Sequence, residues 1–454
     1  MLVTLRRRWP LVLFLALTLT MLFSTVALAG DPNGEMTMAE AENPTAIALT
    51  FVWMLMAAFL VFFMQAGFAL VETGFTRAKN MVNVLTKNFM DFSIGTLAYF
   101  FFGYAIMYGT SMAGLIGTDK FLLLGDFYDV FEARDWMFQM VFAATAATIV
   151  SGAMAERTRI TAYMAYSFLI SAIIYPISGH WVWGGGWLSQ MGFYDFAGSG
   201  VVHMVGGLVG LTGALLVGPR LGKYNADGSA NKFPATNVVF IVIGVLVLFF
   251  GWFGFNAGST LNGNDLRMSI IAMNTMLAGA TAATTVMYAK LVRTGVSDGV
   301  AAGNGALAGL VAITAPCAFV PPWAAVVIGV IAGLVMIWGE GFVENVLKAD
   351  DPVGAVTVHG ILGFVGLLMV GVFADGTYGV SGIIVGDFNQ FVIQLIGAVA
   401  LAAWALITGF IMFWLLKKTM GLRATDEEQT IGLDIAEHGI TVYEKDLMPE
   451  PAGD

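Results

Sequence analysis

The chain has 454 residues, of which 58% are hydrophobic and 11% are charged, and its formal net charge at pH 7 is −10. A soluble core of this length does not need so many apolar residues, so the composition excludes an ordinary soluble protein and predicts a polytopic membrane protein. Much of the acidic excess lies in the C-terminal tail and the outward loops, so nucleic-acid binding is not indicated.

The first 29 residues are predicted to be a cleavable signal peptide. The segment "RRRWP" is followed by the apolar run "LVLFLALTLTMLFSTV" and by "ALA" before Gly30. These are the charged, hydrophobic and small-residue regions of a secretory signal. An uncleaved first transmembrane helix is the alternative, since a run this short spans a bilayer only marginally.

Eleven apolar segments of spanning length follow the signal, and their long uninterrupted runs rule out a strand barrel. The predicted chain therefore has a transmembrane domain over residues 30–417 and a cytoplasmic tail over 418–454. The expected segments are 47–70, 90–108, 135–155, 160–179, 197–218, 236–257, 268–289, 299–317, 322–341, 353–374 and 390–416.

The distribution of Lys and Arg predicts the orientation of these segments. Beyond the signal, one set of alternate loops carries only Lys120, Arg134 and Arg267, and all other Lys and Arg residues lie on the opposite side. Since positive residues favour the cytoplasm, the N-terminus is expected outside and the C-terminus inside.

The fifth and tenth segments share the pattern D-x2-G-x3-V-H-x3-G-x2-G. An odd number of helices per unit means that the two copies enter the membrane from opposite sides. We therefore expect a 5+5 inverted repeat, with repeat one at about 47–218, repeat two at about 236–374, and the final helix outside it. The first copy comprises Asp195, Gly198, Val202, His203, Gly207 and Gly210, and the second Asp351, Gly354, Val358, His359, Gly363 and Gly366.

Each histidine follows an aspartate that is predicted to cap the start of its helix. His203 follows Asp195 and His359 follows Asp351, with Pro352 expected in the first helical turn. Eight residues at ~1.5 Å each would place both rings ~12 Å deep, near the midplane of a ~30 Å hydrocarbon core.

Three interpretations of the histidines follow from the residues. A neutral histidine can simply donate to a backbone carbonyl, and paired histidines are also common metal ligands. The flanking segments offer no Cys, Glu or third His at helical spacing, and the lone Cys317 excludes a multi-cysteine zinc or iron–sulfur site. Duplication at matched positions favours two imidazoles that share a proton or line a narrow path for a small polar solute.

Tryptophans cluster where the fourth segment ends, in "ISGHWVWGGGWLSQ". Most such residues are anchors at the membrane interface. Trp183 differs because Gly184, Gly185 and Gly186 follow it and let the backbone bend sharply, so that its indole face is predicted to face a cavity and attract a cation.

Phenylalanines at helical spacing lie in two other segments. Phe255 and Ser259 in "GWFGFNAGST" are four residues apart, so a ring and a hydroxyl are predicted to face one vestibule. Phe138 and Phe142 repeat this spacing in "MFQMVFAATAAT". Core packing is the alternative for these rings, and a plug above a narrow pore is the interpretation that the histidine pair favours.

Seven segments of the sequence closely resemble the ammonium transporters of the Amt/Mep/Rh family, in its bacterial Amt branch. They are "ETGFTRAKN", "SGAMAER", "WVWGGG", "DFAGSGVVHMVGG", "GWFGFNAGS", "DDPVGAVTVHG" and "GLRATDEEQTIGLD". The resemblance runs from the first segment to the tail. It implies an eleven-helix inverted repeat that assembles as a homotrimer in the inner (plasma) membrane, with one pore per subunit and no cofactor.

The resemblance also implies roles for the matched residues. Phe142, Trp183 and Ser259 would form the outer recruitment site, and Phe142 and Phe255 the gate. His203 and His359 would line the pore and relay protons. Asp195 would support recruitment or deprotonation, in addition to capping its helix.

The predicted function is ammonium transport without an enzymatic reaction. Moving ammonium intact through an apolar pore carries a large desolvation cost, so deprotonation near the gate and passage as ammonia is favoured. The imidazoles supply a donor and an acceptor and can relay the proton separately. Whether net charge crosses stays open.

The tail over 418–454 is acidic and has two interpretations. Its composition is common in solvated disordered ends. The resemblance instead implies a regulatory tail that contacts the subunits and a PII-type signalling protein. The family tail usually continues "HGE", whereas this chain has His438, Gly439 and Ile440, which weakens the PII expectation.

Three other functions compete with transport. A receptor that binds ammonium with little transport is the main alternative, and it is disfavoured because the sequence shows no signalling domain. An intramembrane enzyme lacks a nucleophile and base pair at membrane depth. A pore for carbon dioxide is disfavoured by the aromatic entrance at Trp183, Phe142 and Phe255.

Overall fold

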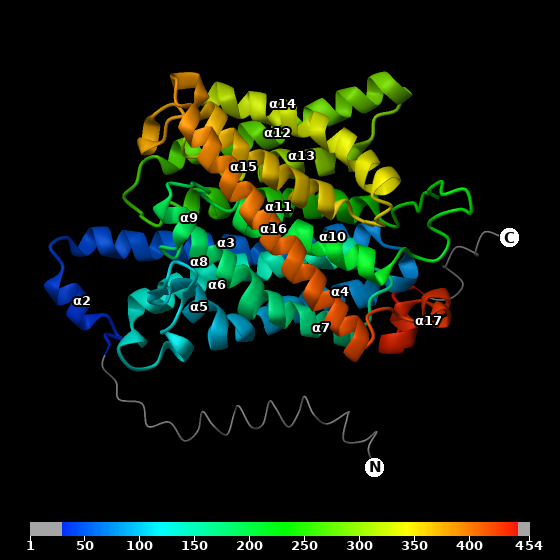
Figure 1. Ribbon diagram of the computed structural model, residues 1–454, viewed down its shortest axis with the longest axis horizontal. Coiled ribbons are helices and arrows are strands. Elements are labelled where there is room, and N and C mark those ends of the chain that lie inside the picture. The colour runs from blue at the N-terminus through cyan, green and yellow to red at the C-terminus, as the bar shows by residue number, and fades with distance from the viewer. Residues whose placement is uncertain (1–29, 444–454) are drawn as a thin grey trace, which may run out of the picture.

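The structure is a computed structural model that describes residues 30–443, and it is built almost entirely of helices (Figure 1). In this range, 10 helices are long and apolar enough to cross a membrane, and the apolar helix Gly299–Thr314 is shorter, with 16 residues. Each predicted apolar segment falls on one of these helices. The predicted signal, residues 1–29, lies outside the described residues.

Among the described spanning helices, two consist of two α-helices joined end to end through a π-helical turn, and three others begin or end with such a turn. π-Helical turns are frequent near functional sites. The first half contains α3 (Pro44–Phe75), α4 (Met81–Ala98) continued by α5 (Tyr104–Tyr108), α6 (Val130–Met154), α7 (Ile160–Leu169) continued by α8 (Tyr175–Val182), and η6 (Ser199–Met204) continued by α10 (Val205–Val217). The second half contains α11 (Val238–Gly258), α12 (Met268–Thr294), α13 (Gly299–Thr314), α14 (Pro322–Gly341) continued by η7 (Phe342–Val346), and η8 (Val356–Ile361) continued by α15 (Leu362–Phe373), and α16 (Phe388–Thr419) follows.

Short elements cover the two ends of the bundle. At one end lie α2 (Glu35–Glu40) and α9 (Trp187–Gln190), and the tail helix α17 (Asp426–Ile431) lies at the opposite end (Figure 1). A small antiparallel hairpin, β1 (Ser111–Met112) with β2 (Ile116–Gly117), pairs Ser111 with Gly117 and Met112 with Ile116. The tail continues from α17 into η11 (Asp434–His438).

Equivalent helices of the two halves pack against each other. The first helices, α3 and α11, lie along one another, while η6 packs against α15 and η8 against α10. An inverted repeat is expected to pack the equivalent helices of its two copies together in this way. The last helix, α16, crosses the bundle obliquely and packs on α10 and α15 (Figure 1).

The helices that carry the two histidines begin later than the sequence predicted. Gly198 (φ 112°) and Gly354 (φ 78°) hold left-handed backbone immediately before these helices. The prediction that Pro352 occupies the first helical turn is therefore wrong, because Pro352 lies in the turn that precedes η8. Both histidines lie in the π-helical segments with which their spans start, so eight residues of helix do not separate them from their aspartates.

Candidate functional site

His203 and His359 meet in the interior between the two halves. Their Nδ1 atoms are 3.1 Å apart, and their ring planes are inclined by 17° with centroids 5.2 Å apart. The residues are 0% and 5% exposed, respectively. At this distance one Nδ1 donates and the other accepts, so a single hydrogen lies between the two rings. Within residues 30–443, no group of three or more His, Cys, Asp or Glu side chains is arranged to hold a metal ion.

Trp252 forms one wall of this pair, and sequence reasoning missed it. Its indole stacks on the His203 ring at 5.1 Å and 15°, and its Nε1 donates to the Thr314 hydroxyl at 2.8 Å. Phe255 stacks on the same imidazole at 5.3 Å. The signal was present, because Trp252 lies three residues before Phe255 and hence on the same face of α11.

The aspartates of the repeated pattern cap the two histidine segments, as predicted. Asp195 accepts from the backbone N–H groups of Gly198, Gly200 and Val201 at 3.0, 2.9 and 2.9 Å. Burial raises the pKa of this carboxyl to about 6, although these hydrogen bonds lower it. In the second copy, Asp351 accepts from the N–H groups of Gly354 and Val356 at 3.1 and 2.7 Å.

Two glycines of the pattern let the histidine helices touch through their backbones. A Cβ on Gly207 would overlap the backbone nitrogen of Gly360, and a Cβ on Gly363 would overlap the carbonyl oxygen of Ser199. Each glycine thus contacts the segment that carries the other copy's histidine. The sequence spacing is therefore a packing requirement of the histidine pair.

A cavity of about 290 Å³ lies next to Trp183, and we name it the outer cavity after the predicted orientation. As predicted, the indole faces a cavity, and its Nε1 is fixed by donation to the Asp195 carbonyl oxygen at 2.8 Å. A Cβ on Gly184 would overlap the Met107 carbonyl oxygen, so the bend after Trp183 requires glycine there. The other lining residues are Tyr108, Phe138, Gln139, Phe142, Val182, Phe196, Ser259 and Leu261.

Two stacked phenylalanines separate this cavity from the histidines. The rings of Phe142 and Phe255 lie 4.2 Å apart at 34°, and both residues are buried. Phe142 also meets Trp183 edge to face at 6.4 Å. The prediction that Phe255 and Ser259 face one vestibule is wrong for Phe255, because Ser259 lines the outer cavity and Phe255 does not. Phe255 instead packs on His203.

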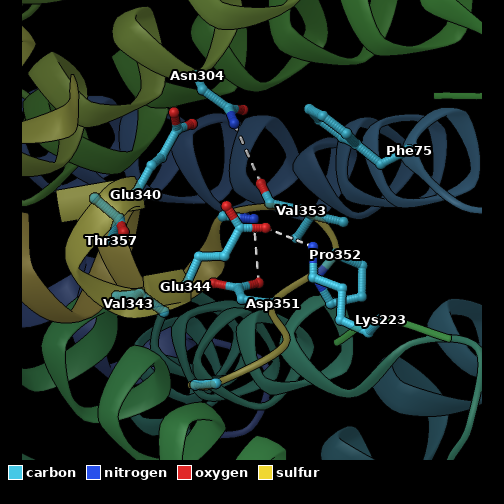
Figure 2. A pocket seen from close by; sticks show the side chains of 12 residues that line it. Phe75, Lys223, Asn304, Glu340, Val343, Glu344, Asp351, Pro352, Val353 and Thr357 are labelled. Carbon is cyan, nitrogen blue, oxygen red and sulfur yellow. Dashed lines mark hydrogen bonds and ion pairs between the residues drawn. The ribbon is translucent and has the colours of Figure 1, made fainter. Parts of the chain in front are cut away.

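Two cavities follow on the far side of the histidine pair. A small one of about 20 Å³ adjoins His359, and it shares the lining residues Asn304 and Val353 with a larger one of about 180 Å³. Figure 2 shows the side chains of Glu340, Glu344 and Asp351 around the larger cavity. Cavities, aromatic pair and histidines thus form one series through the molecule.

A buried group of charged residues lies beside the end of this series that is farther from the outer cavity. Arg220 bonds Glu156 at 2.5 Å and Asp350 at 2.8 Å, and Glu156 also pairs with Arg77. Burial raises the pKa of Glu156 and of Asp350, but the neighbouring arginines outweigh it, so both pKa values lie below the usual range. Sequence reasoning missed this group because its members come from four separate segments.

The described part of the tail packs on the helix ends that lie opposite α2 and α9. The Lys79 ammonium donates to the carbonyl oxygens of Gln429 and Thr430 at 2.7 and 2.9 Å. The backbone N–H of Asn83 donates to the Asp434 carboxylate at 2.8 Å. Residues 418–443 therefore pack against the helix bundle and do not form a solvated end. Residues 444–454 lie outside the described range.

Comparison with known proteins gives a consistent result. The model of the Ammonium Transporter Family matches residues 52–443. "Ammonium transporter Amt2" of Archaeoglobus fulgidus is 52% identical, over 92% of this chain and 92% of its own length. "Putative ammonium transporter sll1017" of Synechocystis sp. is 39% identical, over 89% of this chain and 92% of its own length.

Solved structures agree with these relatives. A "Sensor Amt Protein" is 40% identical, with a TM-score of 0.82 over 87% of this chain and 99% of that chain. Candida albicans Mep2 is 30% identical, with a TM-score of 0.79 over 88% of this chain and 92% of that chain.

Proposed function

Since this chain belongs to the Ammonium Transporter Family and is a multi-pass membrane protein, we propose that it carries ammonium along the series of cavities between Trp183 and Asp351. The observation that carries the proposal is the stacked column of Phe142, Phe255, His203 and His359, which connects an aromatic outer cavity with an acidic inner one.

Recruitment takes place in the outer cavity. A cation over the faces of Trp183 and Phe142 gains ~0.5–2 kcal/mol, and more when it is partly desolvated. The Ser259 hydroxyl donates to the Phe255 carbonyl oxygen at 2.8 Å, so its oxygen lone pairs are free to accept from ammonium. Asp195 acts here by holding Trp183 through its carbonyl oxygen and by capping, through its carboxylate, the backbone at the start of the segment that carries His203.

Passage beyond the aromatic gate takes place as ammonia. The column below Phe142 is apolar except for the imidazoles, so a bare ammonium ion would lose its hydration without compensation. Ammonium gives up its proton at the gate, and the resulting ammonia exchanges hydrogen bonds with His203 and His359. The imidazole pair can accept that proton and relay it along the hydrogen bond between the two rings. Potassium has no proton to lose and no hydrogen bond to donate, so the same column rejects it.

The test is the current on a solid-supported membrane after an ammonium jump, with proteoliposomes of the wild type, His203→Ala and His359→Ala. We expect an ammonium-specific current in the wild type. In both variants this current should be lower by about tenfold or more, because each variant removes one imidazole of the proton relay. His438→Ala, in the tail and away from the column, is the matched control and should keep the wild-type current.

The outcomes separate the mechanisms. A wild-type current that persists in both histidine variants with its selectivity over potassium would refute the relay. Absence of current, with ammonium uptake still registered by internal pH, would indicate passage of ammonia without a relayed proton.

A second candidate function is ammonium sensing with little transport, which the likeness to the "Sensor Amt Protein" favours. The relatives that are named as ammonium transporters make transport the better interpretation. Binding of ammonium in the outer cavity without either a current or an internal pH change would move sensing to first place.

We also propose the assembly and placement that the family resemblance implies. The chain would form a homotrimer in the inner (plasma) membrane, with a cleaved signal, its N-terminus outside and its tail available to a PII-type protein. Native mass spectrometry of the detergent-purified protein tests the trimer and the signal together, since the mass of each subunit reports whether residues 1–29 are present.

A further inference from the structure

The small cavity next to the histidine pair has two titratable residues on its lining, His359 and Glu72. Its other lining residues are apolar except for Asn304. A volume of about 20 Å³ is enough for one molecule of the size of water or ammonia. A molecule that leaves the imidazole pair on the inner side therefore meets a carboxyl group next.

Glu72 is held in place but has no cationic partner. It lies near the end of α3, is 2% exposed, and accepts a hydrogen bond of 2.7 Å from the Ser151 hydroxyl. Among the ion pairs of the described residues, none includes Glu72. Burying a carboxylate without a partner at membrane depth costs about 2.5 kcal/mol or more, so this site favours the protonated acid.

The nearest ammonium group does not neutralise Glu72. Lys87 of α4 points its Nζ at the Thr158 carbonyl oxygen and donates to it at 2.5 Å. The neighbouring carboxyl, Asp91, accepts from the Thr148 hydroxyl at 2.5 Å. The titratable groups that face Glu72 from the packed elements are Lys87, Asp91, Tyr163, Tyr166 and His359.

Glu72 also begins a polar seam, which we define as Glu72, Ser151, Asn88, Asp91, Thr148 and Gln65, between α3, α4 and α6. Thr148 donates to the carboxyl of Asp91 and also lies at 2.9 Å from the Gln65 side-chain oxygen. Three buried atoms of the seam, Gln65 Nε2, Asn88 Oδ1 and Asp91 Oδ1, have no hydrogen-bond partner among the described residues. The seam extends away from the cavity, so Glu72 is its only member on the cavity lining.

We propose that Glu72 is the proton donor of the inner half of the pathway. The proposal rests on the function proposed above, which delivers ammonia past His359. The O–H bond of the Glu72 acid breaks as its proton forms an N–H bond with the ammonia lone pair, which gives ammonium and a carboxylate. Ammonium moves on to the cavity lined by Glu340, Glu344 and Asp351. Water from that cavity then reprotonates Glu72 and releases hydroxide to the inner side.

This assignment explains why a carboxyl lies where a pore for a neutral solute needs none. A donor on the lining of the small cavity converts ammonia to its charged form just before the acidic cavity, and so opposes its return through the column. Glu72 is thus placed to act on the substrate itself rather than to position another residue.

The first test is the initial rate of ammonium uptake into proteoliposomes by the wild type, Glu72→Gln and Glu72→Asp. Glutamine keeps an acceptor for Ser151 but cannot donate a carboxyl proton, so we expect a rate at least about tenfold lower. Aspartate keeps the acid and should restore the rate to within about threefold of the wild type. Asp91→Asn is the matched control, because it changes a carboxyl of the seam that does not line the cavity.

A wild-type rate in Glu72→Gln would overturn the proposal, and so would an equal loss in Glu72→Gln and Asp91→Asn, which would indicate a structural role of the seam. If the wild type itself shows no uptake, the proposed transport fails instead, and the two failures are thereby distinguished.

A second measurement does not depend on the transport rate. Infrared difference spectra of the wild type upon addition of ammonium should contain a negative carboxylic-acid C=O band, since Glu72 loses its proton. The band should be absent in Glu72→Gln and present in Asp91→Asn. Its absence from the wild type, or its persistence in Glu72→Gln, would overturn the proposal.

Discussion

Asp195 makes two structural contacts and has a raised pKa. Its carboxylate caps the segment that carries His203, its carbonyl oxygen holds the Trp183 indole, and its burial raises its pKa to about 6. An unfolded aspartate titrates near ~3.9. The folded chain therefore holds a proton at this site more tightly than the unfolded chain does.

The raised pKa of Asp195 makes the unfolding free energy of the protein depend on pH. The contribution of Asp195 to stability is complete below about pH 4 and is lost as the pH rises through about 6. Asp195→Asn cannot titrate, so the unfolding free energy of the wild type should fall relative to this variant by about 3 kcal/mol between about pH 4 and 7. Thermal unfolding of both detergent-purified proteins across this range measures the difference.

Asp387→Asn serves as the control for this prediction. Asp387 also caps a helix, at the start of α16, but it is not buried. Its variant keeps Asp195, so its pH profile should parallel that of the wild type. A difference between wild type and Asp195→Asn that stays constant with pH would contradict the prediction.

At the scale of the helices, the crossing of the two histidine segments depends on glycine. Gly207 and Gly363 each leave room for backbone of the opposite copy, which cannot move aside as a flexible side chain would. Gly207→Ala and Gly363→Ala should therefore each lower the unfolding free energy by about 1–3 kcal/mol through overpacking. They should also lower the ammonium current, because the separation of His203 and His359 changes with the crossing.

A control glycine lies on a helix of the same fold. A Cβ on Gly341, at the end of α14, would meet nothing within 4 Å, and its φ of −63° suits any residue. Gly341→Ala should leave the thermal midpoint unchanged or slightly higher. Equal midpoints for Gly207→Ala and Gly341→Ala would show that the crossing tolerates a methyl group.

Hydropathy predicted where the spanning helices lie, and the repeated pattern predicted that His203 and His359 are equivalent. Their helix starts were misplaced because a left-handed glycine, rather than the aspartate, ends the preceding turn. The stacking of Trp252 on His203 and the cavity that joins His359 to Glu72 depend on side-chain contacts between distant segments, which no local pattern encodes.

At the scale of the whole molecule, the buried charged group links loops from the two halves. Arg220 reaches Glu156 after α6 and Asp350 before η8, so one side chain links both halves. Removing one partner of a buried pair leaves an uncompensated charge. Arg220→Met should therefore lower the unfolding free energy by about 3–5 kcal/mol at neutral pH, as measured by thermal or denaturant unfolding.

The pH dependence of this variant distinguishes charge from packing. In the wild type both carboxyl pKa values are lowered, so their stabilisation is present above about pH 4 and is lost only as the pH falls through the lower native values. In Arg220→Met the carboxylates lose this partner, and the deficit should shrink as the pH falls toward about 4. Arg159→Met, which removes a half-exposed pair with Glu428 at 3.6 Å, should cost less than about 1 kcal/mol at any pH. A deficit of Arg220→Met that does not vary with pH would indicate lost packing instead.

The helix α4 both contacts the tail and contributes residues to the polar seam. Asn83 of α4 holds Asp434 and Glu437 of the tail, and Asn88 and Asp91 lie within the next eight residues of the same helix, a span of ~12 Å. About two turns of α4 therefore separate the residue that contacts the tail from the residues of the polar seam. A break in α4 between Asn83 and Asn88 would therefore disturb the tail contacts and the polar seam together.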